Sequence, residues 1–393
     1  MPHLHKASNV GCYFRATENR IKDIIYKFKL IKEEMKNLFI MTLFLIMGFS
    51  CNKNNEELIV EENYQCKTEN ILLYKSQNEI TTLFDDYIIQ NLASSNIPDL
   101  NGALSNNKNG YFSVRFQIGI SNLADYTIDI QNTTNLEMLV KSIEYSFQYQ
   151  QTNGDFQIII PPNSNFPTPK EGDIASGNAF FLSSLGLSLL ALEESAFYNS
   201  PINLNFKTRI ENLRPQIQNS LNWLKTKQQI LESYDLNAPN RLFFDAVAFY
   251  SLGKWLNDSN SKSIGINFAQ IGISKKTNNG YFVENNGWDS SYQGVALAVG
   301  FKLLSILSPD ETIKQSLWEC LSCGTNWQKS RILTTGEIST QKNTRVFSGG
   351  EQFLGVQKTV AWKSTIIAFL NMKYLSGNSE YETLSNKIIT FYQ

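Results

Sequence analysis

The chain has 393 residues, 42% of them hydrophobic, and a formal net charge of −1. Residues 1–50 contain 8 of the 35 Lys and Arg residues and 4 of the 36 Asp and Glu residues, which leaves 27 basic and 32 acidic residues in the remainder. Because this remainder has no excess of cations to displace phosphate counterions, nucleic acid is not an expected partner.

Histidine is confined to the start of the chain, at His3 and His5. The rest of the sequence therefore cannot form a Ser-His-Asp or Cys-His nucleophilic site, or a His-ligated metal site. We expect no metal and no cofactor. Any chemistry must depend on carboxylates, Tyr, Lys, Arg or amides.

Residues 35–51 have the pattern of an export signal. Met35-Lys36-Asn37 precedes an apolar run at 38–47, which has signal-peptide length but is shorter than the roughly 20 residues of a membrane span. The following Gly48-Phe49-Ser50-Cys51 resembles the lipobox of bacterial lipoproteins, although Gly48 replaces the usual Leu. The resemblance implies cleavage before Cys51 and its lipidation. A plain secretory signal or a buried helix is the alternative.

The lipoprotein interpretation divides the chain into three parts. Residues 1–50 would comprise an over-called start and the signal peptide, and 51–74 the acylated cysteine with a flexible tether. Residues 52–57 are polar and acidic and resemble surface-export signals of some lipoproteins. The protein would be anchored by lipid to the cell envelope, at the outer membrane, where it could be exposed on the cell surface. The folded domain is expected at 75–393.

Cys320 and Cys323 form a C-x-x-C pair within a predicted helix. A zinc site would need a second pair of ligands, which the sequence does not contain. An exported protein could use the pair in redox chemistry. We expect instead two buried thiols, one helical turn apart.

After residue 75, two kinds of predicted helix alternate. The first is amphipathic, with apolar residues three and four apart, and is expected at residues 78–93, 134–151, 206–229, 260–273 and 310–328. The second is apolar or small on nearly all sides, which is typical of buried helices, and is expected at residues 178–192, 243–252, 290–307 and 359–375. The alternation predicts helical hairpins with one outer and one inner helix.

A repeated turn joins the helices of these hairpins. It contains Asn-Gly followed by an aromatic residue at 109–112, 153–156 and 279–282, with a weaker copy at 335–338. Glycine permits the positive φ of a turn that ends a helix, and the aromatic side chain would fill the seam between hairpins. We expect Gly154 and Gly280 to occupy equivalent left-handed turn positions. Such a repeat indicates units that bury their faces against neighbours.

The predicted fold class is all-α, an incomplete (α/α)5–6 toroid of helical hairpins. The pattern of residues 75–393 resembles the toroids of polysaccharide lyases, six-hairpin glycosidases and terpenoid cyclases. The inner-helix segments contain no Asp-Asp-x-x-Asp or Asp-x-Asp-Asp motif, which argues against cyclisation. An open solenoid such as a tetratricopeptide array is the alternative, but its 34-residue period is not seen.

In a toroid, the loops that lead into the inner helices gather at one end and form a shared cavity. Polar residues are dense in the loops at 171–178, 237–245, 284–293 and 343–358. The catalytic candidates are Tyr292, Asp289 and Asp245. The substrate-binding candidates are Asn240, Arg241, Trp288, Gln293, Arg345, Glu351 and Lys358.

Several of these residues also have a purely structural interpretation. Asp173, Asp289 and Ser290 are good helix N-caps. Arg241 and Asp245, four residues apart on one predicted helix, can simply pair with each other. Arg345 and Lys358 can be surface charges.

As a set, the candidates suit a carbohydrate. Trp288 offers a flat face for a sugar ring, and Arg241, Arg345 and Lys358 could neutralise a uronate carboxylate. Cleavage by β-elimination needs a base at C5, a proton for the leaving oxygen and stabilisation of the carboxyl group. The resemblance to toroidal lyases implies proton transfer by Tyr292 and neutralisation by Asn240 with Arg241. The missing histidine, which many toroidal lyases use as base, departs from that pattern.

The leading hypothesis is a uronate-polysaccharide lyase, and two alternatives stay open. A glycoside hydrolase would need two carboxylates about 5–5.5 Å or 6.5–9.5 Å apart, drawn from Asp245, Asp289 and Glu351. A non-catalytic glycan-binding or structural lipoprotein would need neither. The expected partners are a polysaccharide or oligosaccharide and, through the lipid anchor, a membrane. If a site exists, Arg241, Asp245, Asp289, Tyr292, Arg345 and Glu351 should line one pocket.

Overall fold

The computed structural model describes residues 66–393, except 163 and 165. These residues belong to one compact unit, which spans 60–393. The described part is mostly helical and contains only two short strands, β1 (Gln352–Phe353) and β2 (Val356–Gln357), which pair antiparallel. The predicted all-α fold class is therefore confirmed. The signal sequence, the lipobox and Cys51 lie outside the described residues.

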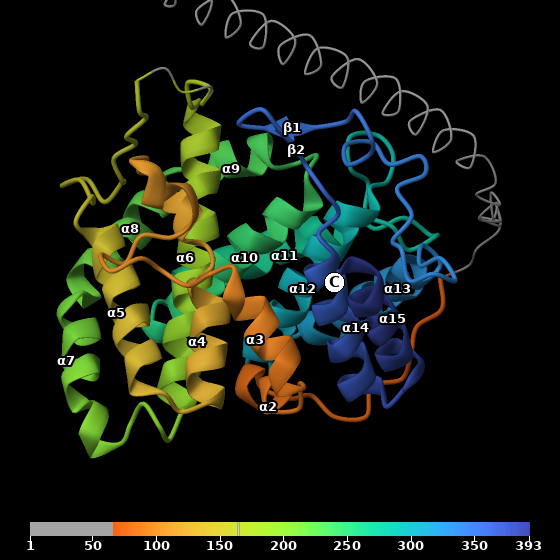
Figure 1. Cartoon of the computed structure of the whole chain (residues 1–393), viewed down its shortest axis with the longest axis horizontal. Helices are drawn as coiled ribbons and strands as arrows, with labels where there is room; N and C mark the ends of the chain where they lie inside the picture. Colours follow the sequence, from red (N-terminus) through yellow and green to blue (C-terminus); the bar gives the residue numbers. More distant parts are fainter. Residues whose placement is uncertain (1–65, 163, 165) are drawn as a thin grey trace, which may run out of the picture. The chain divides into compact units, whose positions relative to one another are not determined.

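The inner helices carry the core of the domain. They follow one another in chain order, and each packs against the next: α4 (Ile120–Asp129), α6 (Glu171–Glu194), α10 (Pro239–Trp255), α12 (Ser290–Ile306) and α14 (Trp362–Ser376) (Figure 1). α6 and α12 bury nearly every residue after their first turn, because apolar and small side chains surround both helices. The segments predicted as inner helices all have this role.

The outer helices cover the inner ones. They are α5 (Thr133–Phe147), α7 (Leu204–Asn212), α8 (Arg214–Thr226), α11 (Ser259–Ser274), α13 (Ile313–Lys329) and α15 (Glu380–Tyr392). Each inner helix packs against an outer partner, in the pairs α4–α5, α6–α8, α10–α11, α12–α13 and α14–α15. The predicted alternation of amphipathic and apolar helices is thus confirmed, but each inner helix pairs with the outer helix that follows it in the chain and not with the one before it. The helix predicted at 206–229 is divided into α7 and α8, and α4, α9 (Gln228–Tyr234) and α15 were not predicted.

The first predicted helix, at 78–93, is broken in the structure. It forms α2 (Gln77–Thr81) and α3 (Asp86–Ser94), because Asp85 accepts a hydrogen bond from the Tyr87 amide and starts a new helix there. α2 packs against α4, α6 and α12, and α3 packs against α4. Lys363 of α14 donates a hydrogen bond to the Asn91 carbonyl of α3. α3 therefore contacts both the first and the last of the inner helices.

The repeated Gly turns are equivalent. Gly154, Gly280 and Gly336 all have positive φ, at 94°, 96° and 91°, and each amide donates to the carbonyl three residues earlier. A Cβ on Gly154 would lie 2.3 Å from the Asn219 carbonyl oxygen of α8, so only glycine allows this close approach. The residues two positions later are buried: Phe156, Phe282 and Ile338. The prediction for Gly154 and Gly280 is confirmed.

The N-terminal segment at 66–74 is attached to the domain, contrary to the expected tether. Cys66 forms a disulfide with Cys323 of α13. The Glu69 amide donates to the Ser322 hydroxyl at 2.7 Å, and the Trp318 indole donates to the Glu69 carbonyl at 3.0 Å. The expected tether therefore ends before residue 66.

The disulfide also corrects the expected pair of free thiols in α13. Cys323 is oxidised, and only Cys320 remains a free cysteine among the described residues. Burial raises the pKa of the Cys320 thiol to about 12, which keeps it protonated and unreactive. The C-x-x-C spacing gave no indication of this disulfide, because Cys66, the partner of Cys323, lies 257 residues away in sequence.

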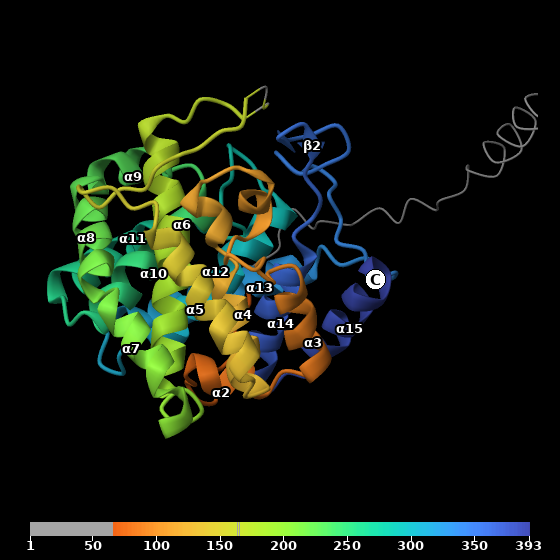
Figure 2. The same ribbon diagram turned by 60° about the vertical axis from the view of Figure 1, so that its left-hand side comes forward.

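Among the described residues, α6 alone is long and apolar enough to cross a membrane. However, 94% of its apolar window is buried inside the domain, as expected for a core helix. In Figures 1 and 2 the β1–β2 hairpin, α9 and the segment between α5 and α6 lie at the same end of the domain. The candidate site lies at this end.

Candidate functional site

Tyr292, in the first turn of α12, forms a hydrogen-bonded cluster with residues of the β1–β2 hairpin. Its hydroxyl donates to Glu351 Oε2 at 2.9 Å and accepts a hydrogen bond from Lys358 Nζ at 2.7 Å. Lys358 also donates to Glu351 Oε1 at 2.8 Å. Burial raises the pKa of Tyr292, so the phenol is protonated in this arrangement.

Arg345 holds two carboxylates and covers the tyrosine ring. It binds Glu351 through Nε and Nη2, both at 2.9 Å, in a bidentate pair, and it donates to Glu284 through Nη1. Its guanidinium carbon lies 4.1 Å from the centroid of the Tyr292 ring. Bidentate pairing and stacking together fix the orientation of an arginine. Arg345 therefore orders the charged cluster.

The two carboxylates bound by Arg345 differ in acidity. Burial raises the pKa of Glu284 to about 7, although Arg345 opposes the shift. Burial also opposes ionisation of Glu351, but the hydrogen bonds from Arg345 and Lys358 outweigh it and lower the pKa of Glu351 to about 2. Glu284 is only 2% exposed. Glu351 is thus ionised, and it lines an open cavity beside the cluster.

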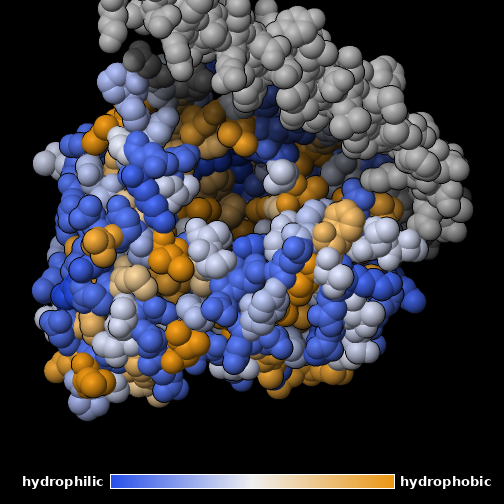
Figure 3. Space-filling model, in the orientation of Figure 1, coloured by the Kyte–Doolittle hydropathy of each residue, from blue (hydrophilic) through white to orange (hydrophobic). Residues whose placement is uncertain are grey.

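An open cavity of about 670 Å³ lies beside the cluster. One side comes from α9, α10 and the loop between them, and the other from the segment before β1 and the loop at Asn285. Its lining residues include Tyr234, Asn237, Arg241, Asn285, Thr344, Arg345, Phe347 and Glu351. Figure 3 shows a hollow below the β1–β2 hairpin, with both hydrophilic and hydrophobic residues in its depth. The cavity is therefore open to solvent and lined by charged and polar groups.

Arg241 contributes a second cation to this cavity. Its Nη1 donates to Asp235 Oδ1 at 3.1 Å, and its guanidinium lies 5.4 Å from the ring of Tyr234. Tyr234 in turn donates from its hydroxyl to Asp173. The considered pairing of Arg241 with Asp245 is therefore not formed, since Asp235 takes the place of Asp245.

Asp245 does not line the cavity. It is fully buried in α10, and neither carboxylate oxygen has a hydrogen-bond partner among the described residues. Burial and the nearby Asp235 raise the pKa of Asp245 well above its ordinary value. Its carboxylate is therefore not placed to reach a substrate in the cavity. Asn240 is also buried, at 5% exposure, and does not line the cavity.

Asp289 has a structural role at the start of α12. It is 1% exposed and accepts hydrogen bonds from the amides of Ser291, Tyr292, Arg345 and Val346. Two of these amides belong to the N-terminus of α12 and two to the loop that carries Arg345. Asp289 therefore joins the loop to the helix, as the N-cap interpretation suggested. Its oxygens are not available for catalysis.

Trp288 and Gln293 are also engaged inside the domain. The Trp288 ring meets Tyr281 and Trp327 edge to face, at 5.4 and 6.2 Å between centroids. Gln293 is 3% exposed, accepts from the Phe282 amide and donates to the Gly280 carbonyl. Gln293 thus holds the repeated turn in place and is not available to a substrate, whereas Trp288 is partly exposed but does not line the cavity.

Of the six residues expected to share one pocket, Arg241, Arg345 and Glu351 line the cavity. Tyr292 does not line the cavity itself but is hydrogen-bonded to Glu351, which does. The sequence analysis missed Arg115, which lies in a 3-10 turn, η2 (Val114–Gln117), and is close enough to Arg241, Tyr292 and Lys358 to influence their charges. A lone arginine between Val114 and Phe116 was the available signal in the sequence.

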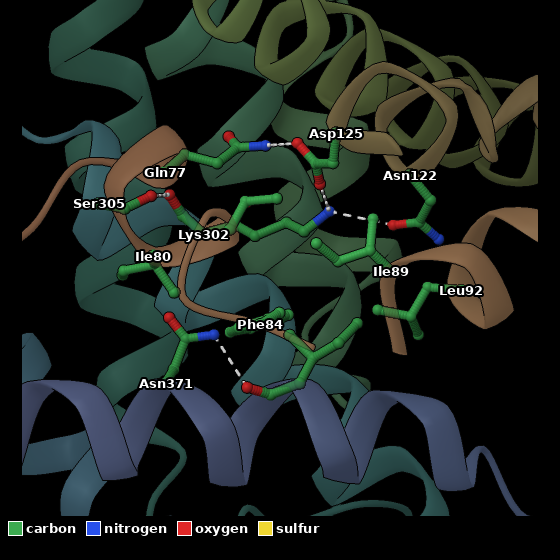
Figure 4. A pocket seen from close by; sticks show the side chains of 12 residues that line it. Gln77, Ile80, Phe84, Ile89, Leu92, Asn122, Asp125, Lys302, Ser305 and Asn371 are labelled. Carbon is green, nitrogen blue, oxygen red and sulfur yellow. Dashed lines mark hydrogen bonds and ion pairs between the residues drawn. The ribbon is translucent and has the colours of Figure 1, made fainter. Parts of the chain in front are cut away.

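A further cavity lies at the opposite end of the domain, between α2, α4, α12 and α14 (Figure 4). Gln77 of α2 donates to Asp125 Oδ1 at 2.7 Å, and Lys302 Nζ of α12 lies 3.7 Å from Asp125 Oδ2. Lys302 also donates to Asn122 Oδ1 at 3.3 Å. These polar groups bind one another and tie α2 to two inner helices, although Gln77 Oε1 has no hydrogen-bond partner among the described residues.

No group of three or more His, Cys, Asp and Glu side chains in the described part of the chain could hold a metal ion. No protein-family model matches the sequence, and no curated protein sequence shows significant similarity to it. The function is therefore inferred from the geometry of the site.

Proposed function

We propose that the protein is a lyase that cleaves uronate-containing polysaccharides by β-elimination, with Tyr292 as the proton-transfer residue. The observation that carries the proposal is the Tyr292–Lys358–Glu351 cluster beside an open, arginine-lined cavity. The cavity is large enough for sugar residues, and its cations, Arg241 and Arg345, suit the carboxylate of a uronate.

The cluster has groups for each requirement of the reaction. Tyr292 is protonated because burial raises its pKa, which suits donation of a proton to the leaving glycosidic oxygen. Lys358, at 2.7 Å from the phenol oxygen, can exchange a proton with Tyr292. Burial lowers the pKa of Lys358 although Glu351 opposes it, so its neutral amine is more accessible as a base. Arg241 and Arg345 would stabilise the charge that develops on the carboxyl group.

Hydrolysis has less support. It requires two carboxylates facing the substrate, whereas of Asp245, Asp289 and Glu351 only Glu351 lines the cavity. Glu351 is held by Arg345 and Lys358, and its pKa is lowered to about 2 despite its burial. Elimination by the tyrosine cluster therefore fits the geometry better.

The test is a screen of purified protein on uronate-containing and neutral polysaccharides. Elimination is followed by the ultraviolet absorbance of the unsaturated product, and reducing ends are counted separately. Tyr292→Phe should lower the rate by roughly 10²–10⁴-fold. Tyr250→Phe is the matched control, because Tyr250 is a buried tyrosine whose hydroxyl bonds Ser308 and Glu311. It should leave the rate unchanged.

Two outcomes would contradict the lyase, and a third would contradict the role of Tyr292. Reducing ends without unsaturated product would indicate hydrolysis. Binding of polysaccharide without either product would indicate a glycan-binding protein. Full activity of Tyr292→Phe would remove the proposed role of Tyr292.

We also propose that the domain is an α/α toroid exported on a lipid anchor. The contacts among the inner helices, with α3 between α14 and α4, support a closed arrangement. The Cys66–Cys323 disulfide supports an oxidising, extracytoplasmic location. Cys51→Ala should abolish lipid labelling and release the protein from membranes, and normal membrane fractionation of this variant would contradict the anchor.

A further inference from the structure

Arg115 differs from every other arginine in the described part of the chain. Its guanidinium faces aromatic rings, at 4.9 Å from the centroid of Phe180 and 5.9 Å from that of Phe353. It has no hydrogen-bond partner among the described residues. The remaining arginines there all donate hydrogen bonds: Arg209, Arg214, Arg241, Arg331 and Arg345. The five N–H donors of Arg115 are therefore unused.

The carboxylates near Arg115 are already bonded to other groups. Asp173 accepts from Tyr234 and from the Lys170 amide, and Asp235 is bound by Arg241. Burial, and then the positive charge of Arg241, lower the pKa of Arg115. A guanidinium remains charged even so, and a partly buried charge without a partner is unfavourable. Asp173 and Asp235 offset part of the charge of Arg115, but neither accepts a hydrogen bond from its guanidinium.

A narrow slot of about 70 Å³ adjoins Arg115. Phe166 and Phe353 form its apolar walls, and Asn178 and Asp173 supply polar atoms. Gly177, within the buried helix α6, leaves room here, because a Cβ at this position would contact the Arg115 Cβ at 3.4 Å. Glycine inside a helix is otherwise destabilising by about 1 kcal/mol. The slot therefore combines a free cation, apolar rings and space.

The β1–β2 hairpin connects this slot with the Tyr292 cluster. Phe353 in β1 packs edge to face against Phe116 and Phe166, at 6.2 and 6.3 Å between centroids. Glu351 and Lys358, which bond Tyr292, flank the same hairpin. One ligand could therefore contact both the cluster and the slot.

We propose that Arg115 and the aromatic walls formed by Phe166 and Phe353 make a second acid-binding subsite, which holds the carboxylate or sulfate group of a sugar next to the one at Tyr292. The inference rests on the proposed function and specifies its substrate. The preferred polymer carries acidic groups on consecutive sugars. A polymer in which neutral sugars alternate with uronates would leave Arg115 unpaired.

The test measures affinity by isothermal titration calorimetry with matched oligosaccharides. The probes are a polyuronate, an alternating uronate and neutral-sugar chain, a sulfated neutral chain and a neutral chain. Tyr292→Phe is the background, so that no probe is cleaved. Arg115→Gln should weaken polyuronate binding by about 10- to 100-fold, the range for a hydrogen bond to a charged group, and affect the alternating chain much less. Binding of the sulfated chain that depends on Arg115 would identify sulfate as the acid group.

Two further variants separate binding from folding. Arg214→Gln removes an arginine that pairs with Glu211, and it should leave all affinities unchanged. Gly177→Ala keeps Arg115 but narrows the slot, and it should also weaken polyuronate binding. Thermal unfolding of Arg115→Gln should show little loss of stability, because removal of an unpaired charge offsets the lost contacts with Phe180 and Phe353. A lower melting temperature with unchanged affinity would instead show a structural arginine and overturn the proposal.

The two proposals fail in different ways. Equal affinity of Arg115→Gln and its background for polyuronate, with cleavage by the Tyr292-containing protein intact, would refute the subsite alone. Absence of binding to every acidic probe would refute the proposed function, and the subsite with it.

Discussion

Replacing Asp289 by Ala tests whether this carboxylate is structural. The side chain accepts four backbone hydrogen bonds and is 1% exposed. Two bonds cap α12, and loss of a helix cap costs about 0.5–2 kcal/mol. The other two satisfy the amides of Arg345 and Val346, and each buried amide left without a partner costs about 1–3 kcal/mol. The free energy of unfolding should therefore fall by about 2.5–8 kcal/mol.

The assay is urea unfolding followed by circular dichroism. Asp85→Ala is the matched control, because Asp85 is an exposed N-cap that accepts a hydrogen bond from one helix amide, that of Tyr87. It should lose only about 1 kcal/mol. Asp289→Asn keeps one carbonyl acceptor and should fall between the two. If Asp289→Ala loses no more stability than Asp85→Ala, the four hydrogen bonds do not have the proposed role.

The remaining predictions concern the turns, the buried carboxyl and the disulfide. Gly110 has positive φ, but a Cβ at this position would meet open space, so Gly110→Ala should lower the free energy of unfolding by about 1–2 kcal/mol. Gly154→Ala should lower it by about 1–3 kcal/mol more, because the new Cβ would clash with the backbone. Equal losses of stability for the two variants in denaturant unfolding would contradict the turn geometry. Burial raises the pKa of Asp245 above 3.8, so the folded state retains a proton that the unfolded state loses, and stability should fall as pH rises above about that value. Asp245→Asn should remove a slope of up to about 1.4 kcal/mol per pH unit, and an unchanged pH profile would show that Asp245 does not titrate. Cys66→Ser should lower stability by about 2–5 kcal/mol and expose the amides of 66–74 to hydrogen exchange, whereas unchanged protection would show that the disulfide does not hold this segment.

The helical hairpins followed from the sequence because their signals are local. A repeat of three and four residues marks an amphipathic helix wherever it packs, and helices that are apolar all round can only be buried. The turns at Gly154 and Gly280 were predictable for the same reason, since an Asn-Gly pair determines its own backbone conformation. The break between α2 and α3 was also local, but the Asp85 cap that causes it was overlooked.

The candidate site was only partly predictable. Tyr292, Arg345, Glu351 and Lys358 were identified from the polar density of two loops, and the structure joins them in one cluster. Arg115 was missed because it lies in none of the loops considered. Its importance depends on Phe353 and on what the nearby carboxylates already bind.

Only the tertiary structure decided which carboxylates can face a substrate. The sequence showed Asp245, Asp289 and Glu351 as equivalent polar residues near inner-helix starts. The fold gives Asp289 the amides of a loop 56 and 57 residues away, encloses Asp245 without partners and leaves Glu351 at the cavity. The sequence by itself determined the elements and their inner or outer faces, because hydrophobic periodicity acts within one helix. Burial, charge and pairing of a side chain depend on segments distant in sequence, and these meet only in the folded domain.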